Sequence, residues 1–101
     1  MWVFAMFDLP VDTKEAKRAY VQFRKALLRS GFNMLQYSVY ARYCPSEESS
    51  DVYRRHVQTE LPGEGRVRLL YVTDHQFGKM QVFDGKTRKP VEEPPPQMML
   101  F

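Results

Sequence analysis

The chain has 101 residues, a size typical of one domain that leaves little room for a second hydrophobic core. Its composition is 44% hydrophobic and 27% charged, which argues against global disorder and predicts a folded globular protein. The formal net charge of +3 permits an anionic partner such as nucleic acid without requiring one.

The cysteine content and the start of the sequence indicate the cellular compartment. Cys44 is the single cysteine and cannot form an intrachain disulfide, and the residues after Met1 lack the basic and then apolar pattern of a secretory signal. No apolar run approaches the roughly 18 residues of a membrane span. We therefore expect a cytoplasmic protein with no membrane segment, and Cys44 as a small residue at the end of a strand.

The first two predicted elements are a strand and a helix. Residues 2–7 form an unbroken apolar run that ends at Asp8, which predicts a short strand buried on both faces. Asp12 followed by Glu15 is an N-cap and capping-box pattern. Apolar residues then recur at helical spacing until a glycine, so the sequence predicts a helix over about residues 13 to 30.

The second half of the chain predicts alternating elements as well. Residues at about 33 to 42 alternate as in a strand, which Pro45 closes. A second helix begins at Ser46 and is broken at residues 61–63. The remaining predicted elements are a strand at 66–73, a loop holding Asp74, His75 and Gln76, and a short strand at 80–83.

This order predicts the architecture. With the long middle strand split, it matches an α+β, ferredoxin-like βαββαβ sheet with both helices on one face, which we assign to residues 1–85. Both alternate sets of the first strand are apolar, so we expect a second copy of the chain to cover the open face in a homodimer. Residues 86–101 are expected to form a Pro-rich linker and an apolar tail, Met98 to Phe101, which either docks or frays.

Asp8 is the strongest candidate for chemistry because it ends a buried strand, where a side chain is both positioned and reachable. One aspartate per chain cannot form a two-metal phosphodiesterase site. Two copies facing each other across a dimer axis could hold one Mg²⁺ that keeps several of its waters. The alternative is an Asx turn that introduces Leu9 and Pro10.

The first helix carries a basic stripe. Four of its cations fall in one narrow sector opposite the apolar residues, and a stripe of one sign is typical of a surface that contacts phosphates. A solvated helix face is the alternative. The candidate nucleic-acid contacts are Lys14, Lys17, Arg18, Lys25 and Arg29, which Arg54, Arg55, Arg66, Arg68, Arg88 and Lys89 could extend. His56 and His75 lack metal-ligand spacing and are expected in loops or on the surface.

The middle strand has a polar alternate set that is unusual for a sheet. We expect Gln36, Ser38 and Tyr40 to share the open face with Asp8 and to form hydrogen bonds at the dimer seam or around a metal and phosphate site. Met34 and Arg42 complete this set. The other set, which includes Leu35, Tyr37 and Val39, is then expected to fill the core beneath the helices.

Three segments carry a resemblance to a known family. They are "FDLP" at the end of the first strand, "GFNMLQYSVYAR", and "RLLYVTDHQFGKM". Together they resemble the CRISPR-associated protein 2 family over residues 1–85, and the "MLQYSVY" block is especially similar to members from type II systems. The resemblance implies an antiviral-defence protein, a ferredoxin-like homodimer that bridges two dimers of the CRISPR integrase, CRISPR-associated protein 1, in spacer acquisition.

The resemblance also implies a site. Family members are described as metal-dependent endonucleases, hydrolases of RNA or double-stranded DNA, in which the aspartate that matches Asp8 binds Mg²⁺. Ser38 and Tyr40 match the family's "QxSV" block and its following aromatic residue. Met34 stands where many members have a basic residue, so a phosphate contact from that position is not implied here. The alternative function is an RNA-cleaving toxin similar to virulence-associated protein D, which shares the ferredoxin-like plan.

Overall fold

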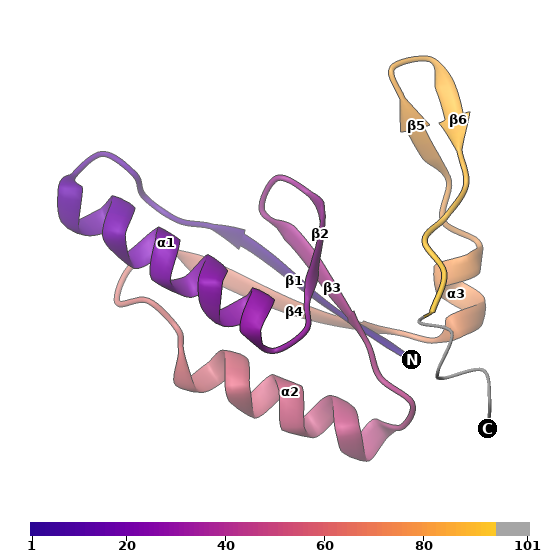
Figure 1. The fold of residues 1–101 in the computed structure, drawn as a ribbon, viewed down its shortest axis with the longest axis horizontal. Coiled ribbons are helices and arrows are strands. Elements are labelled where there is room, and N and C mark those ends of the chain that lie inside the picture. The colour runs from indigo at the N-terminus through magenta and orange to yellow at the C-terminus, as the bar shows by residue number, and fades with distance from the viewer. Residues whose placement is uncertain (95–101) are drawn as a thin grey trace.

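The structure, a computed structural model, describes residues 1–94 as one α+β domain with a small hairpin beside it (Figure 1). A four-stranded antiparallel sheet has the order β2-β3-β1-β4, so the predicted ferredoxin-like βαββαβ arrangement is confirmed. The elements are β1 (Trp2–Asp8), α1 (Lys14–Arg29), β2 (Asn33–Gln36), β3 (Val39–Tyr43), α2 (Glu47–Thr59), β4 (Arg66–Val72), α3 (Asp74–Gly78), β5 (Val82–Asp84) and β6 (Thr87–Lys89).

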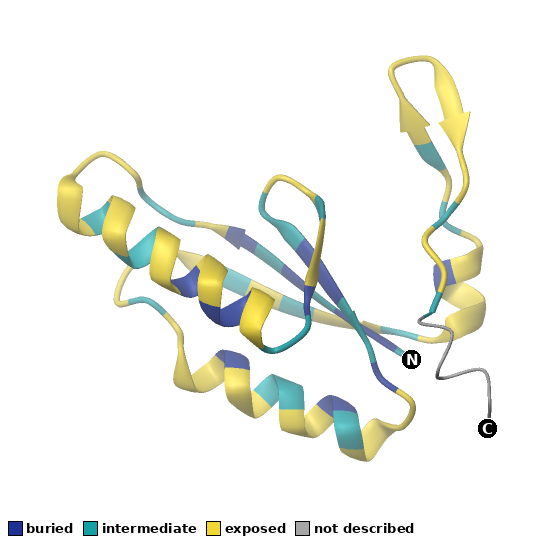
Figure 2. Cartoon of the chain, in the orientation of Figure 1, coloured by how far each residue is buried: buried dark blue, intermediate teal, exposed yellow. Residues whose placement is uncertain are grey.

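The main core lies between the sheet and its two long helices. Phe23 and Leu27 of α1 and Val57 of α2 pack with residues of β1 that include Val3 and Phe7. The rings of Phe7 and Phe23 meet edge to face with their centroids 5.2 Å apart. Both helices therefore cover the same face of the sheet. Figure 2 shows the buried positions of α1, α2 and β1 that contribute to this core.

Both long helices begin at side-chain caps. Thr13 is the N-cap of α1 and its hydroxyl accepts a hydrogen bond from the backbone N–H of Ala16, so the predicted cap at Asp12 was wrong by one residue. α2 begins at the predicted place, with Ser46 as its N-cap in a reciprocal capping box with Ser49. These bonds satisfy N–H groups that a helix leaves unpaired in its first turn.

The long middle strand is split into a β2–β3 hairpin whose turn contains Tyr37 and Ser38. Ser38 adopts a φ of +63°, a left-handed conformation that few non-glycine residues take. The pairing register also shifts between Met34 and Gln36. Tyr37 is 87% exposed at this turn, so its expected place in the core was wrong.

The pairing with β1 decides which face each residue of β3 occupies. Tyr40 lies opposite Ala5 and is only 1% exposed, in the core beneath the helices. The prediction that Tyr40 shares the open face with Asp8 was therefore wrong. Val39 lies opposite Met6, on the open face, because paired residues of neighbouring strands point to the same side, and Leu35 packs against the cluster of Trp2 and Phe77 on that face. The core positions predicted for Leu35 and Val39 were therefore also wrong.

The segment after β4 forms a short helix and not the loop predicted at residues 74–76. Thr73 and Gln76 form a capping box that starts α3, and Phe77 from this helix is buried against Trp2 on the open face of the sheet. The two rings stack with centroids 3.9 Å apart and planes at 8°. The open face is therefore partly covered by the chain itself.

The chain then leaves the sheet. β5 and β6 pair only with each other, as a hairpin that projects away from the domain and is largely exposed (Figures 1 and 2). The predicted strand at residues 80–83 thus corresponds to β5, outside the main sheet. The division proposed at residue 85 falls in the turn of this hairpin and stays a prediction. The predicted apolar tail, Met98 to Phe101, lies outside the described residues.

Cys44 is fully buried just after β3, as expected of a structural residue. Burial raises the pKa of its thiol, although the nearby Arg42 guanidinium acts in the opposite direction. Within residues 1–94, no helix has both the length and the apolar character needed to cross a membrane.

Candidate metal and nucleic-acid site

Asp8 is the last residue of β1, and its exposed side chain lies on the open face of the sheet. Arg66 of β4 lies directly opposite Asp8, and Arg68 lies opposite Met6 two positions earlier. Because alternate residues of a strand share a face, one carboxylate and two guanidinium groups gather at this end of the open face. Neither arginine forms an ion pair with Asp8 among the described residues.

The two arginines were expected to extend the stripe on α1, and the register shows that they do not. They lie on the open face of the sheet, whereas α1 covers the other face. The signal was present in the sequence, since Arg66, Arg68 and Leu70 alternate along one side of a strand. Only the antiparallel pairing with β1 reveals that this side is also the side of Asp8.

Two loops hold the backbone around Asp8. The N–H of Phe7 donates to the carbonyl of Ser38, 3.0 Å away, which attaches the β2–β3 turn to the end of β1. Gly65 has a φ of +94° and packs so closely that a β-carbon there would lie 2.8 Å from the Asp8 carbonyl oxygen and 2.6 Å from a methyl group of Leu9. The position of Asp8 is therefore fixed from both sides.

The three polar candidates of the hairpin occupy different environments. Gln36 is exposed and lies opposite Val39, which places it on the open face with Asp8. Ser38 is half-buried in the turn beside the end of β1. Tyr40 is on the opposite face, where its hydroxyl accepts a hydrogen bond of 2.9 Å from Nε of Arg24 in α1. The structure therefore brings Gln36 and Ser38 to the end of β1 and excludes Tyr40.

A metal ion at Asp8 would find few ligands in one protomer. Within the part of the chain that the structure describes, no three His, Cys, Asp or Glu side chains are grouped to hold a metal. The positive charges of the neighbouring Arg66 and Arg68 also repel a metal cation at Asp8. Mg²⁺ is commonly held by only one or two carboxylates and keeps several waters, so the aspartates of two protomers would match its needs.

The basic stripe of α1 lies on the helix side of the sheet, opposite the open face that carries Asp8. The buried side of this helix is formed by Phe23, Ala26 and Leu27, and all five basic candidates are exposed. They are Lys14, Lys17, Arg18, Lys25 and Arg29. The stripe and Asp8 are thus on opposite sides of the sheet, and they form two separate charged surfaces.

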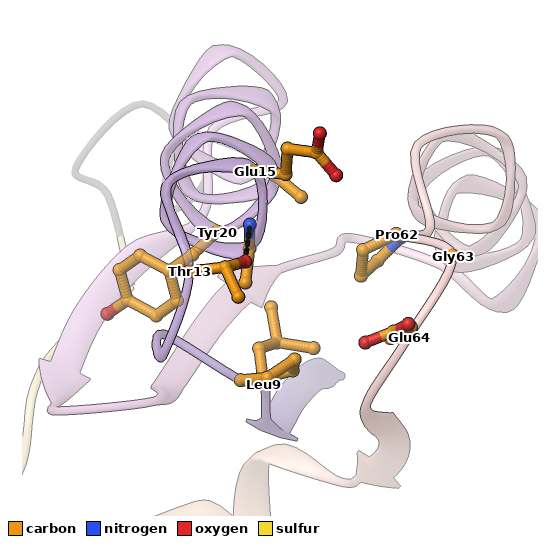
Figure 3. Close-up of a pocket in the computed structure, with 10 residues that line it drawn as sticks. Leu9, Thr13, Glu15, Tyr20, Pro62, Gly63 and Glu64 are labelled. Carbon is orange, nitrogen blue, oxygen red and sulfur yellow. Dashed lines mark hydrogen bonds between the residues drawn. The ribbon is translucent and has the colours of Figure 1, made fainter.

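A small hollow lies beside the end of β1, between the first turns of α1 and the loop before β4 (Figure 3). Leu9 and Tyr20 contribute apolar surface, and Glu15 and Glu64 contribute carboxylates. Its volume of about 200 Å³ is below the about 300 Å³ at which pockets for organic ligands begin. Asp8 does not line it, so a small-molecule site is not indicated there.

The comparisons with known proteins identify the family of the chain. The family model of the CRISPR associated protein Cas2 matches residues 1–80, which span β1 to α3. The chain belongs to the Cas2 family. The resemblance seen in the sequence is thereby confirmed at the level of the family, whereas nothing here assigns the chain to a system type.

Curated relatives match over the whole chain. A "CRISPR-associated endoribonuclease Cas2" from Parvibaculum lavamentivorans is 50% identical over 101 residues, which cover all of both chains. A protein of the same name from Paracidovorax avenae is 44% identical, over all of this chain and 94% of its own length. Another from Flavobacterium psychrophilum is 38% identical, over all of this chain and 88% of its own. The similarity thus includes the hairpin and the segment after it.

Proposed function

We propose that this Cas2 protein acts as a homodimeric scaffold in CRISPR spacer acquisition, where it binds spacer DNA and bridges dimers of the CRISPR integrase. A divalent-metal-dependent endonuclease activity at the paired Asp8 residues is part of the same proposal. The family membership supports the CRISPR role over the toxin-like alternative. One observation carries the rest: Asp8 stands on a sheet face that residues 1–94 leave uncovered at its own end and that α3 closes at the other.

The open face supports a dimer. Leu70 of β4 lies opposite Phe4 on this face and is 48% exposed, and Met6 between Phe4 and Asp8 is only half-buried. Exposed apolar residues on a sheet face favour burial against another surface. A two-fold axis near this end would place a second Asp8 opposite the first, since a symmetric dimer contacts itself through the same patch.

The charges support binding to a nucleic-acid backbone. Arg66 and Arg68 lie beside the Asp8 end of β1, on the neighbouring strand β4, and the outward side of α1 offers a second line of cations. Such residues contact phosphates, and their contacts set position and affinity without selecting a base sequence. We therefore expect binding that weakens as the salt concentration rises and that differs little between duplexes of different sequence.

Cleavage is proposed at the dimer axis. The curated relatives carry the name endoribonuclease, which supports a phosphodiester substrate. Two Asp8 carboxylates would hold Mg²⁺, which when bound polarises a phosphoryl oxygen and makes a bound water more acidic. Arg66 and Arg68 would bind phosphates next to the one that is cleaved, and Gly65 would keep Asp8 in position.

The test is the substitution Asp8→Asn, which keeps the shape of the side chain and removes its charge. We expect it to reduce Mg²⁺-dependent cleavage by the purified protein to the level of a protein-free sample and to leave duplex binding and spacer acquisition in cells intact. Asp84→Asn, on the exposed β5–β6 hairpin, is the matched control and should change neither. Cleavage that survives Asp8→Asn would contradict the catalytic assignment, and lost acquisition would contradict a purely architectural role.

A further inference from the structure

A second charged feature lies on the helix side of the sheet, away from Asp8. It is an open cleft of about 320 Å³ between the end of α1 and the middle of α2, lined by Arg29, Ser30, Gly31, Arg42, Tyr53 and His56. Arg42 belongs to β3 and lies opposite Val3, a core residue beneath the helices. Three elements that are distant in the sequence therefore converge on this cleft.

The guanidinium of Arg42 is held in place but lacks a counter-charge. Its Nη2 donates to the hydroxyl of Tyr53, and its carbon atom lies 4.3 Å from the centre of the Tyr53 ring. Its Nε is buried and has no hydrogen-bond partner among residues 1–94. No carboxylate within that described part forms an ion pair with it. A buried donor without an acceptor is rare in proteins and often marks a missing water or ion.

Gly31 provides the space for this guanidinium. A β-carbon on Gly31 would collide with Nη1 of Arg42, and the φ of +82° at this position already disfavours any other residue. The glycine that ends α1 therefore also allows the arginine to lie flat against the backbone. The arrangement is fixed by the fold, since Tyr53 holds one side of the guanidinium and Gly31 faces the other.

The surroundings of the cleft are basic. Arg29 and His56 line it together with Arg42, and no carboxylate of residues 1–94 does. Acidic groups line neighbouring hollows: Glu60 lines one that shares His56 with the cleft, and Glu92 and Glu93 line one that shares Arg42. The backbone N–H groups of Ser30 and Gly31 are already bonded to carbonyls of α1, so a ligand would be recognised by side chains.

We propose that this cleft binds a phosphate group of a nucleic-acid backbone. Arginine presents several donors in a planar fork that matches phosphate, and this one is ordered before any ligand arrives. Arg29 follows Lys25 by one helical turn, so the cleft continues the exposed basic line along α1. The inference rests on the proposed binding of DNA, and it adds Arg42 and His56 of the helical face to that function.

The first arm of the test measures duplex binding by fluorescence anisotropy across a salt series, using the full-length protein. Arg42→Gln should weaken binding about tenfold at low salt and lower the slope of log affinity against log salt by about 1, since one phosphate contact is lost. His56→Gln, an exposed position, should weaken binding about threefold without affecting folding. Lys86→Gln in the β5–β6 turn removes a charge of the same sign and should change neither quantity.

The second arm uses inorganic phosphate as the probe and needs no loss-of-function variant. The NMR signal of the Arg42 Nε–H, identified by its disappearance in Arg42→Lys, should shift on addition of phosphate and on addition of duplex. A shift on addition of phosphate without any shift on addition of duplex would assign the cleft to a free anion and overturn the nucleic-acid assignment. No shift with either probe would overturn the proposal outright.

The remaining outcomes separate this inference from the proposed function. If the wild-type protein binds no duplex, the proposed function and the nucleic-acid assignment fall together. If it binds duplex and both cleft variants behave as Lys86→Gln does, only the cleft inference falls. If the cleft variants instead lose binding to the integrase while keeping duplex affinity, the cleft is a protein-docking site and the proposal is wrong.

Discussion

The two ends of β1 differ sharply on the open side of the sheet. At the first end, Trp2 stacks on Phe77 of α3, and the centroid of Phe4 lies 5.8 Å from the same ring, in a buried aromatic cluster. At the other end, Asp8 and Arg66 are exposed. One strand face is thus core at one end and charged surface at the other. α3 therefore covers part of the face that the apolar alternation of β1 assigned to a second copy of the chain, and the proposed dimer contact is confined to the Asp8 end.

Removing Phe77 should break the covered end and have the largest effect. Phe77→Ala deletes a buried ring that contacts Trp2 and Phe4, so we expect the free energy of unfolding to fall by about 3–5 kcal/mol. Urea denaturation at a fixed protein concentration measures this change. Phe83→Ala on the exposed hairpin is the matched control, since Phe83 is 59% exposed, and should stay within about 0.5 kcal/mol of the wild type. Equal effects of the two substitutions would contradict the assignment of α3 as a cover.

A substitution at Gly65 should disturb the charged end. Gly65→Ala forces a side chain onto a left-handed residue and into the Asp8 carbonyl, which should cost about 1–3 kcal/mol of stability and displace Asp8. We expect Mg²⁺-dependent cleavage to fall more than duplex binding does. Gly63→Ala, where a β-carbon meets nothing within 4 Å, should preserve both activities. A Gly65→Ala protein with normal stability and cleavage would show that this contact does not position Asp8.

The pH dependence associated with Cys44 should give the smallest effect. Its thiol lies in the core beneath the long helices, next to the start of β1, where the Cys44 N–H donates to the Met1 carbonyl. Burial raises the pKa of its thiol above the value in the unfolded chain. This contribution to stability is full below the unfolded pKa and is lost as the pH rises through the folded pKa. The difference in unfolding free energy between the wild type and Cys44→Ala should therefore shrink at alkaline pH. A constant difference would indicate that the thiol is not shielded.

The fold could be predicted largely because its helices carry local signals. Ser46 is a side-chain cap, and the apolar spacing of α1 reaches a glycine at its end. The split of the middle strand was expected from the overall order, but its place at Tyr37 and Ser38 was not, because the alternation runs on through both residues and neither glycine nor proline marks the turn. The capping box of α3, from Thr73 to Gln76, was a readable signal that was overlooked.

The candidate site was predictable only in part for a related reason. Asp8 could be found because it ends an apolar strand, a property of the local sequence. Alternation divides the residues around Tyr40 into two sets, but only pairing with β1 shows which set faces the helices. The position of Arg66 opposite Asp8 depends on the same register. The cleft at Arg42 is formed by residues of α1, β3 and α2, and no local sequence pattern predicts that these segments come into contact.

Metal stoichiometry decides whether the Asp8 residues of two protomers act together. Mn²⁺, a spectroscopic substitute for Mg²⁺, would be titrated into the full-length protein and followed by electron paramagnetic resonance, with the mass in solution measured by light scattering. We expect a dimer that binds one ion per two chains, and no such ion in Asp8→Asn. A monomer that binds one ion per chain, or binding that Asp8→Asn leaves unchanged, would contradict this expectation.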